Sequence, residues 1–196
     1  GVQLPKASID KTIAAGVGLV PEDRRTQGLI LEASVADNLG LATMMPTSKF
    51  GFADLKGQRN RENDTARKLR IRMANIDQTA GSLSGGNQQK IVFGKWSMAN
   101  VKVLLLEEPT RVVDVGARVE IYELINEITA NGGAVLMASS DLPEVLGMSD
   151  RVLVMSNGKL SGEMPASEAT QERVMSLAVS HMNEDFSENT TANVEK

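Results

Sequence analysis

The feature that most constrains the fold is a short apolar run at residues 101–106, which ends directly in two glutamates and a proline. A nearly unbroken apolar run of this length is typical of a central parallel strand that is covered on both faces. Pro109 prevents strand pairing from continuing. Carboxylates at the carboxyl end of such a strand lie where open α/β sheets bind ligands. Glu107 and Glu108 are therefore predicted to face a ligand, although two solvated charges capping a strand would give the same local pattern.

A glycine-rich segment precedes this strand. Residues 83–90 read Leu-Ser-Gly-Gly-Asn-Gln-Gln-Lys, a polar start to a helix. Ser84 is predicted to cap that helix with its hydroxyl. Gly85 and Gly86 have no side chains, so a phosphate can approach the free N–H groups of the first turn, where the helix dipole favours its negative charge. Alone, the pattern is more typical of a capped surface helix. The acidic strand end that follows favours the phosphate interpretation.

Composition narrows the class of protein. The chain has 196 residues, 41% of them hydrophobic, which suffices for one well-buried α/β domain. A net charge of −4 and few aromatic residues argue against binding to nucleic acid. The absence of cysteine excludes a disulfide framework and suits a reducing compartment. No apolar stretch approaches the roughly 20 residues that cross a bilayer. Any association with a membrane is therefore expected to go through a partner.

Caps and apolar periodicity predict alternating helices and strands. The expected helical segments cover 8–15, 34–41, 54–75, a segment starting at 85, 115–130, 141–147 and about 167–180; the expected strands cover 17–20, 101–106 and 134–138. Asp141 and Glu144 have the spacing of a capping box at the start of the 141–147 helix, and Asn157-Gly158 is expected to join a hairpin of 151–156 and 159–164. Residues 21–25 and 110–114 are expected to be loops. We expect one partial domain over 1–181, with a helical subdomain at about 34–98, exposed over 54–75, and a disordered tail over 182–196. His181 is expected at the surface, without a catalytic role.

Together, the two motifs resemble the signature and Walker B motifs of ATP-binding-cassette (ABC) ATPases. This implies an α/β fold of the P-loop NTPase class, with a parallel sheet core and a helical subdomain. Finer details over about residues 1–180 resemble the second nucleotide-binding domain of bacterial sugar importers of the ribose, galactose and xylose type. The segments that carry this resemblance are 15–25 (Ala-Gly-Val-Gly-Leu-Val-Pro-Glu-Asp-Arg-Arg) with Gly-Leu at 28–29, Asn-Gln-Gln-Lys at 87–90, Thr-Arg at 110–111 with Asp-Val-Gly-Ala at 114–117, Ser-Ser-Asp-Leu-Pro-Glu-Val-Leu at 139–146 and Ser-Asp-Arg at 149–151.

The resemblance implies a mechanism in which two such domains close face to face around two ATP molecules. The signature helix of one domain then contacts the γ-phosphate held by the Walker A loop of the other. Asp114 matches the D-loop aspartate that links the two sites across the interface. The nucleotide-binding residues implied for this chain are Ser84, Gly85, Gly86, Gln88 and Asp114.

The resemblance also assigns roles around the reacting phosphate. Glu107 would help to hold Mg²⁺ through water, because Mg²⁺ prefers oxygen ligands and keeps part of its hydration shell. Glu108 would orient or deprotonate the attacking water. Glu22 falls at the Q-loop position, which senses Mg²⁺ or water and relays closure to the permease. Ser140 falls at the switch position, which is histidine in many relatives.

The implied function is ATP hydrolysis that energises sugar import. The implied partners are a companion nucleotide-binding domain of the same full-length polypeptide, the transmembrane permease subunits and, indirectly, a periplasmic sugar-binding protein. Residues 34–75 would receive the coupling helix of the permease. The implied location is the cytoplasmic face of the bacterial plasma membrane, as a peripheral subunit. No partnership with nucleic acid is expected.

Three departures from the family pattern qualify this interpretation. No Gly-x-x-x-x-Gly-Lys-Ser/Thr motif occurs in the printed sequence, so we expect a domain without its N-terminal Walker A part, inactive by itself. Glu107 replaces the usual aspartate, which moves the carboxylate outward by one methylene. Val112 replaces a glycine, and a β-branched residue would be strained there if φ is positive. The alternatives are a non-catalytic ABC-type interaction module and a non-transport ABC ATPase.

Overall fold

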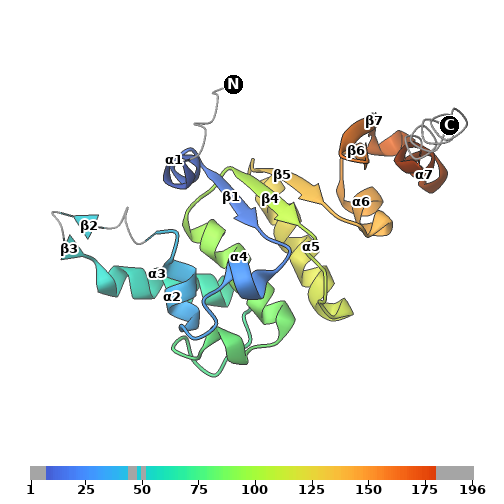
Figure 1. Cartoon of the computed structure of the whole chain (residues 1–196). Helices are drawn as coiled ribbons and strands as arrows, with labels where there is room; N and C mark the ends of the chain where they lie inside the picture. The colour runs from blue at the N-terminus through green and yellow to red at the C-terminus, as the bar shows by residue number, and fades with distance from the viewer. Residues whose placement is uncertain (1–7, 44–47, 50–51, 180–196) are drawn as a thin grey trace, which may run out of the picture. The chain divides into compact units, whose positions relative to one another are not determined.

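The computed structural model describes residues 8–43, 48–49 and 52–179. The chain divides into two compact units, 1–138 and 139–196, which are taken one at a time here (Figure 1). Within the described ranges, none of the helices is long and apolar enough to span a membrane. His181 and the predicted disordered tail lie outside the described residues.

A three-stranded parallel sheet organises the first unit. Its strands are β1 (Val17–Val20), β4 (Val103–Glu107) and β5 (Ala134–Ala138), in the order β1-β4-β5. The prediction that the apolar run before the two glutamates forms a central parallel strand is therefore confirmed. Helices α4 (Gly85–Met98) and α5 (Val115–Ala130) contact the strands and each other (Figure 1). The predicted starts of both helices are confirmed.

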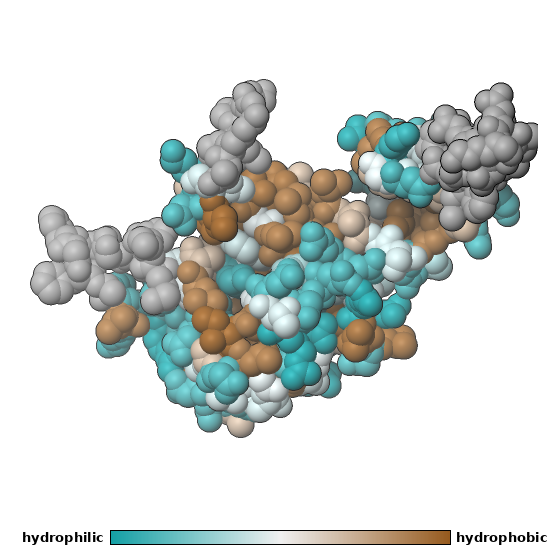
Figure 2. Space-filling model, viewed as in Figure 1, coloured by the Kyte–Doolittle hydropathy of each residue, from teal (hydrophilic) through white to brown (hydrophobic). Residues whose placement is uncertain are grey.

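Only one face of the sheet is closely covered within the described residues. On that face Leu104 and Leu106 are buried, and the indole of Trp96 in α4 packs against Gly18. On the other face a row across the sheet joins Leu19 to Leu105 and Leu105 to Leu136. Leu19 is 40% exposed and Leu136 56% exposed. The prediction of coverage on both faces is therefore wrong for the described chain, because its single layer of α4 and α5 packs on one side. Apolar residues gather over these strands in Figure 2.

Three helices pack together beside the sheet: α2 (Val35–Gly40), α3 (Leu55–Lys68) and α4. Ser34 caps α2 in a capping box with Asp37, as the sequence indicates for its N-terminus. Helix α3 is shorter than predicted, because the chain turns at Arg70, whose φ is +50°. The unit also contains α1 (Ile9–Ala14), the short antiparallel pair β2 (Ser48–Lys49) and β3 (Phe52–Ala53), a π-helical turn η1 (Arg24–Gly28) and a 3-10 turn η2 (Ala80–Ser82).

The second unit is a hairpin packed against two helices. Its elements are α6 (Leu142–Met148), β6 (Arg151–Ser156), β7 (Lys159–Pro165), the 3-10 turn η3 (Ala166–Glu168) and α7 (Gln171–Val179). The predicted Asn-Gly turn is confirmed, since Asn157 and Gly158 both have positive φ, at 48° and 75°. The core consists of buried Val152, Val154, Met164 and Val174. The last helix begins later than predicted, at Gln171, because η3 occupies the preceding residues.

Candidate functional site

The two glutamates end the central strand in a strained backbone. Glu107 is the last residue of β4 and is exposed. Glu108 has φ +45°, and its amide donates a hydrogen bond to the carbonyl of Ala138 at 2.8 Å. Non-glycine residues in this conformation are uncommon and gather at functional sites. The hydrogen bond to Ala138 in β5 thus fixes the backbone at the point where the chain leaves the sheet. The side chain of Glu107 is exposed at this point.

The loop after the glutamates contains a second residue with positive φ. Pro109 and Thr110 are buried and anchor its beginning. The amide of Arg111 donates to the carbonyl of Glu108 at 3.0 Å. Val112 follows with φ +55° and a side chain that is 81% exposed, which confirms the prediction that a β-branched residue would be strained here. Asp114 then caps α5 by accepting a hydrogen bond from the amide of Ala117 at 2.9 Å.

Helix α4 begins after Ser84, but the hydroxyl of Ser84 does not cap its backbone. It accepts a hydrogen bond from the side-chain amide of Asn87 at 2.9 Å instead. The predicted hydroxyl cap is therefore wrong, and the reason is the side chain one turn further along the helix. Asn87 also accepts from the backbone amide of Arg72 at 2.8 Å, so it connects the helix start to the chain that follows α3.

The two glycines at the start of α4 leave room for protein atoms. A Cβ on Gly86 would lie 2.5 Å from the Cβ of Ala117, so α4 and α5 can approach this closely only with glycine there. A Cβ on Gly85 would lie 2.6 Å from Nη2 of Arg24. Gly86 is buried and Gly85 half-buried. Close packing therefore explains why both positions are glycine, which the sequence does not reveal. Contact of their amides with phosphate stays a prediction.

Two further polar residues of α4 are buried. Gln88 is only 4% exposed, and its side-chain amide donates to the carbonyl of Ala80 in η2 at 3.2 Å. In the described chain Gln88 therefore stabilises the turn before α4, and nucleotide binding by it stays a prediction. Lys90 is 2% exposed; its Nζ lies 2.6 Å from the carboxylate of Glu120 in α5 and donates to the carbonyl of Arg70 at 3.1 Å. Sequence reasoning missed the buried ion pair, although a lysine followed directly by Ile-Val-Phe signals it.

The segment before η1 reaches the loop that follows the two glutamates. Glu22 forms an ion pair with the guanidinium of Arg111. Arg24 is 9% exposed and donates from Nη1 to the carbonyl of Arg111 at 3.3 Å and from Nη2 to that of Val112 at 3.4 Å. Burial, and then the neighbouring charge of Arg25, lower the pKa of the Arg24 guanidinium. The structure thus brings Glu22 together with this loop and adds Arg24, which sequence reasoning missed.

Ser140 belongs to the second unit and is exposed there. Beside it, the hydroxyl of Ser139 donates to the buried carboxylate of Glu144 at 2.5 Å and accepts from the amide of Asp141 at 3.1 Å. Asp141 caps α6, as predicted, by accepting from the amide of Glu144 at 3.3 Å. The side chain of Glu144, which the sequence pairs with Asp141 in a capping box, thus bonds Ser139. This network fixes the backbone around Ser140.

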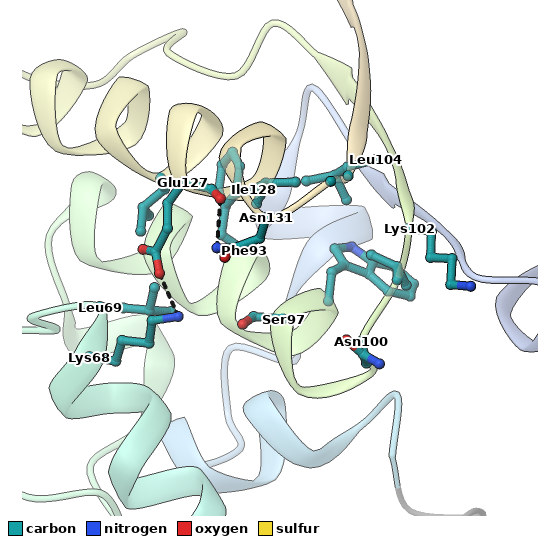
Figure 3. Close-up of a pocket in the computed structure, with 15 residues that line it drawn as sticks. Lys68, Leu69, Phe93, Ser97, Asn100, Lys102, Leu104, Glu127, Ile128 and Asn131 are labelled. Atoms are coloured by element: carbon teal, nitrogen blue, oxygen red, sulfur yellow. Dashed lines mark hydrogen bonds and ion pairs between the residues drawn. The ribbon is translucent and has the colours of Figure 1, made fainter.

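A pocket of about 660 Å³ lies elsewhere in the first unit (Figure 3). Its lining includes Lys102 and Leu104 at the start of β4, whereas Glu107 ends the same strand. The carboxylate of Glu127 pairs with Lys68 at 2.6 Å at one side of the pocket (Figure 3). None of the residues predicted from the sequence to act on a ligand lines this pocket.

The end of β4 offers an exposed carboxylate of the kind that takes part in magnesium sites. Across the described residues there is no cluster of three or more histidine, cysteine or acidic side chains that could hold a metal ion. Mg²⁺ is commonly bound through one or two carboxylates together with phosphate oxygens and water. The carboxylate of Glu107 is exposed and would hold such an ion through a bound water, with a nucleotide and solvent as its ligands.

This fold is found in solved ATP-binding cassettes. One match is a post-hydrolysis dimer of a cassette bound to ADP and phosphate, with a TM-score of 0.67, 18% identity, and coverage of 80% of this chain and 66% of that chain. Another is a nucleotide-free cassette from an ABC transporter, with a TM-score of 0.66, 21% identity, and coverage of 86% and 66%. The chain thus has the fold of these cassettes, a parallel α/β sheet with a helical subdomain.

The sequence matches a particular group within that class. A ribose import ATP-binding protein of Streptomyces avermitilis is 60% identical over 92% of this chain, and one of Corynebacterium glutamicum is 56% identical over 100% of it. The chain is thus homologous to ribose import ATP-binding proteins, as the sequence resemblance predicts. It spans about a third of their length, 34% and 37% respectively. No protein-family model matches the chain.

Proposed function

We propose that the chain is part of an ATPase that energises the import of a sugar, ribose being the first candidate. The observation that carries this proposal is the 60% identity to a ribose import ATP-binding protein across 92% of the chain. Supporting it, the paired glutamates stand at the carboxyl end of the central strand, where open α/β sheets bind their ligands. The partners in this proposal are a companion nucleotide-binding domain, transmembrane permease subunits and a periplasmic sugar-binding protein, at the cytoplasmic face of the membrane.

In this proposal the predicted residues act on the attacking water, on Mg²⁺ and on the phosphate. Glu108 accepts the proton of the attacking water, or orients that water, and its backbone strain would fix the carboxylate in one direction. Glu107 would help to hold Mg²⁺ through a bound water, and the ion would neutralise phosphate charge. Ser84, Gly85 and Gly86 present the helix start to a phosphate held by the companion domain, with Gln88 supporting that helix start.

The other three residues would connect the site to its surroundings. Asp114 caps α5 next to the signature helix and would link the two sites across the domain interface. Glu22 would relay the position of its segment to the loop after Glu108 through Arg111. Ser140 would hydrogen-bond the γ-phosphate or its water, without the positive charge that a protonated histidine provides.

The decisive experiment uses the complete ATP-binding protein that contains this chain, assembled with its permease. Replacing Glu108 by Gln should retain ATP binding and lower the turnover number for ATP hydrolysis by at least about 100-fold, because general-base catalysis contributes about 10²–10⁴ in rate. A matched control is Glu32→Gln, which removes an exposed carboxylate elsewhere and should leave turnover unchanged. Unchanged turnover in Glu108→Gln would favour the alternative of a non-catalytic interaction module.

A further inference from the structure

The guanidinium of Arg24 is buried where three functional segments meet. It donates to the carbonyls of Arg111 and Val112, both in the loop that follows Glu108. It also occupies the space that a side chain on Gly85 would need. Its Nε is buried and has no hydrogen-bond partner among the described residues. A buried guanidinium is costly unless hydrogen bonds satisfy its N–H groups, and the two bonds that Arg24 makes both go to this loop.

The contact between these segments is reciprocal. Arg24, from the segment that begins at Glu22, holds the carbonyls of Arg111 and Val112, while the side chain of Arg111 reaches back to the carboxylate of Glu22. A displacement of the segment around Glu22 must therefore stretch two sets of contacts to the loop. The two hydrogen bonds are long, at 3.3 and 3.4 Å, but they come from one planar guanidinium and act together with the ion pair, so the loop should follow the segment.

The loop itself is strained at the residue that Arg24 holds. Val112 has φ +55°, a conformation that disfavours β-branched residues, and its 81% exposed side chain contributes little packing to keep it there. Arg24 donates to the carbonyl of this same residue. The strain at Val112 thus favours a rearrangement of the loop, and the hydrogen bond from the buried guanidinium opposes it.

We propose that Arg24 is a positioning residue that holds the loop from Arg111 to Asp114 in its strained conformation against the start of α4, and so sets Glu108 according to the position of Glu22. This inference rests on the proposed ATPase function for its effect on turnover. Its structural part, the holding of the loop, is independent of that function. The two parts therefore have separate tests.

The first test measures amide hydrogen exchange of the loop in the chain as printed. The amides of Arg111 and Val113 are hydrogen-bonded within the loop, to the carbonyls of Glu108 and Thr110. Replacing Arg24 by Met or by Lys should accelerate exchange at both amides by about tenfold or more, since two hydrogen bonds from a charged donor are lost or distorted. The control Arg25→Met, at an exposed neighbour, should leave both rates unchanged.

A double-mutant cycle separates positioning from general support of the fold. With glycine at position 112 the loop is relaxed, so Arg24→Lys should change exchange at Arg111 and Val113 clearly less than it does beside valine. Equal effects in the two backgrounds would overturn the proposal. So would wild-type exchange rates in Arg24→Lys, or an Arg24→Lys chain that does not fold, because Arg24 would then be a structural anchor only.

The second test measures ATP hydrolysis in the complete protein. Arg24→Lys should lower the turnover number by about tenfold while the KM for ATP stays close to that of the wild type, because the residue acts through the loop and not on the nucleotide. Turnover equal to that of Arg25→Met would overturn the effect on catalysis. A wild-type protein that hydrolyses no ATP would overturn the proposed function instead, and the exchange measurements would still decide whether Arg24 holds the loop.

Discussion

At the scale of single residues, the unusual feature is two positive φ angles within five positions. Glu108 and Val112 both adopt the left-handed conformation, at φ 45° and 55°. Neither is a glycine, so the surrounding structure must hold them there. For Glu108 the hydrogen bond to Ala138 does so, and for Val112 the guanidinium of Arg24 does. Strain of this kind is expected where a side chain must point in one direction.

Replacing Val112 by Gly should stabilise the first unit by up to about 1 kcal/mol, because glycine adopts this conformation without steric cost while a non-glycine residue loses about 1–2 kcal/mol there. Urea unfolding followed by the fluorescence of Trp96, the only tryptophan, measures this change. The matched control is Val119→Gly inside α5, which should destabilise the unit by about 0.5–1 kcal/mol. A loss of stability in Val112→Gly comparable to that control would contradict the reading of strain.

At the scale of elements, the packing of α4 against α5 is the contact that shapes the site. The pair Gly86 and Ala117 lets the two helices approach closely at their starts. Further along, the buried ion pair of Lys90 and Glu120 joins them at 2.6 Å. Because Asp114 caps α5 and Ser84 directly precedes α4, these contacts fix where both helices start.

Replacing Glu120 by Gln should destabilise the first unit by about 3 kcal/mol, since it leaves the ammonium of Lys90 buried without its charged partner, with the carbonyl of Arg70 still accepting one hydrogen bond. The control is Glu123→Gln on the same helix, whose partner Arg70 is exposed and 3.9 Å away, and it should cost less than about 1 kcal/mol. Chemical unfolding of both variants provides the comparison. Equal losses would mean that burial does not decide the strength of these ion pairs.

At the scale of the whole molecule, the sheet offers one closely covered face and one apolar face that stays partly exposed. Leu19 and Leu136 on the second face belong to the row through Leu105. The relatives are about three times as long as this chain. The printed residues contain segments that resemble the signature and Walker B motifs but no Gly-x-x-x-x-Gly-Lys-Ser/Thr motif, so we expect that the phosphate cradle and its lysine are not supplied by these residues.

The chain by itself should therefore bind ATP more weakly than micromolar. Titration calorimetry of the 196-residue chain with Mg²⁺ and ATP should show no saturable heat in the micromolar range. The complete ATP-binding protein, titrated under the same conditions, is the positive control. Micromolar affinity in the chain alone would show that its own residues cradle the phosphates, contrary to the reading of its motifs.

Much of the fold followed from local patterns. Ser34, the Asn-Gly turn at 157–158 and the apolar run before Glu107 were sufficient to place a helix start, a hairpin and the central strand, because caps, turns and strand periodicity depend on neighbouring residues. The class of protein was indicated by a resemblance to a known family, because the glycine-rich helix start and the acid pair that follows it match the order of the signature and Walker B motifs of ABC ATPases.

Only the tertiary structure decided what the polar residues between these elements do. In the folded chain, Gln88 donates to the carbonyl of Ala80, and the hydroxyl of Ser84 accepts from Asn87. Arg24 is buried and donates to the carbonyls of residues 111 and 112. The physical reason is that a polar side chain takes the partner that folding brings near, and Arg24 lies 87 positions from Arg111 in the sequence. Local pattern determines where a helix or strand begins, whereas the partner of a buried charge depends on which distant segments pack around it.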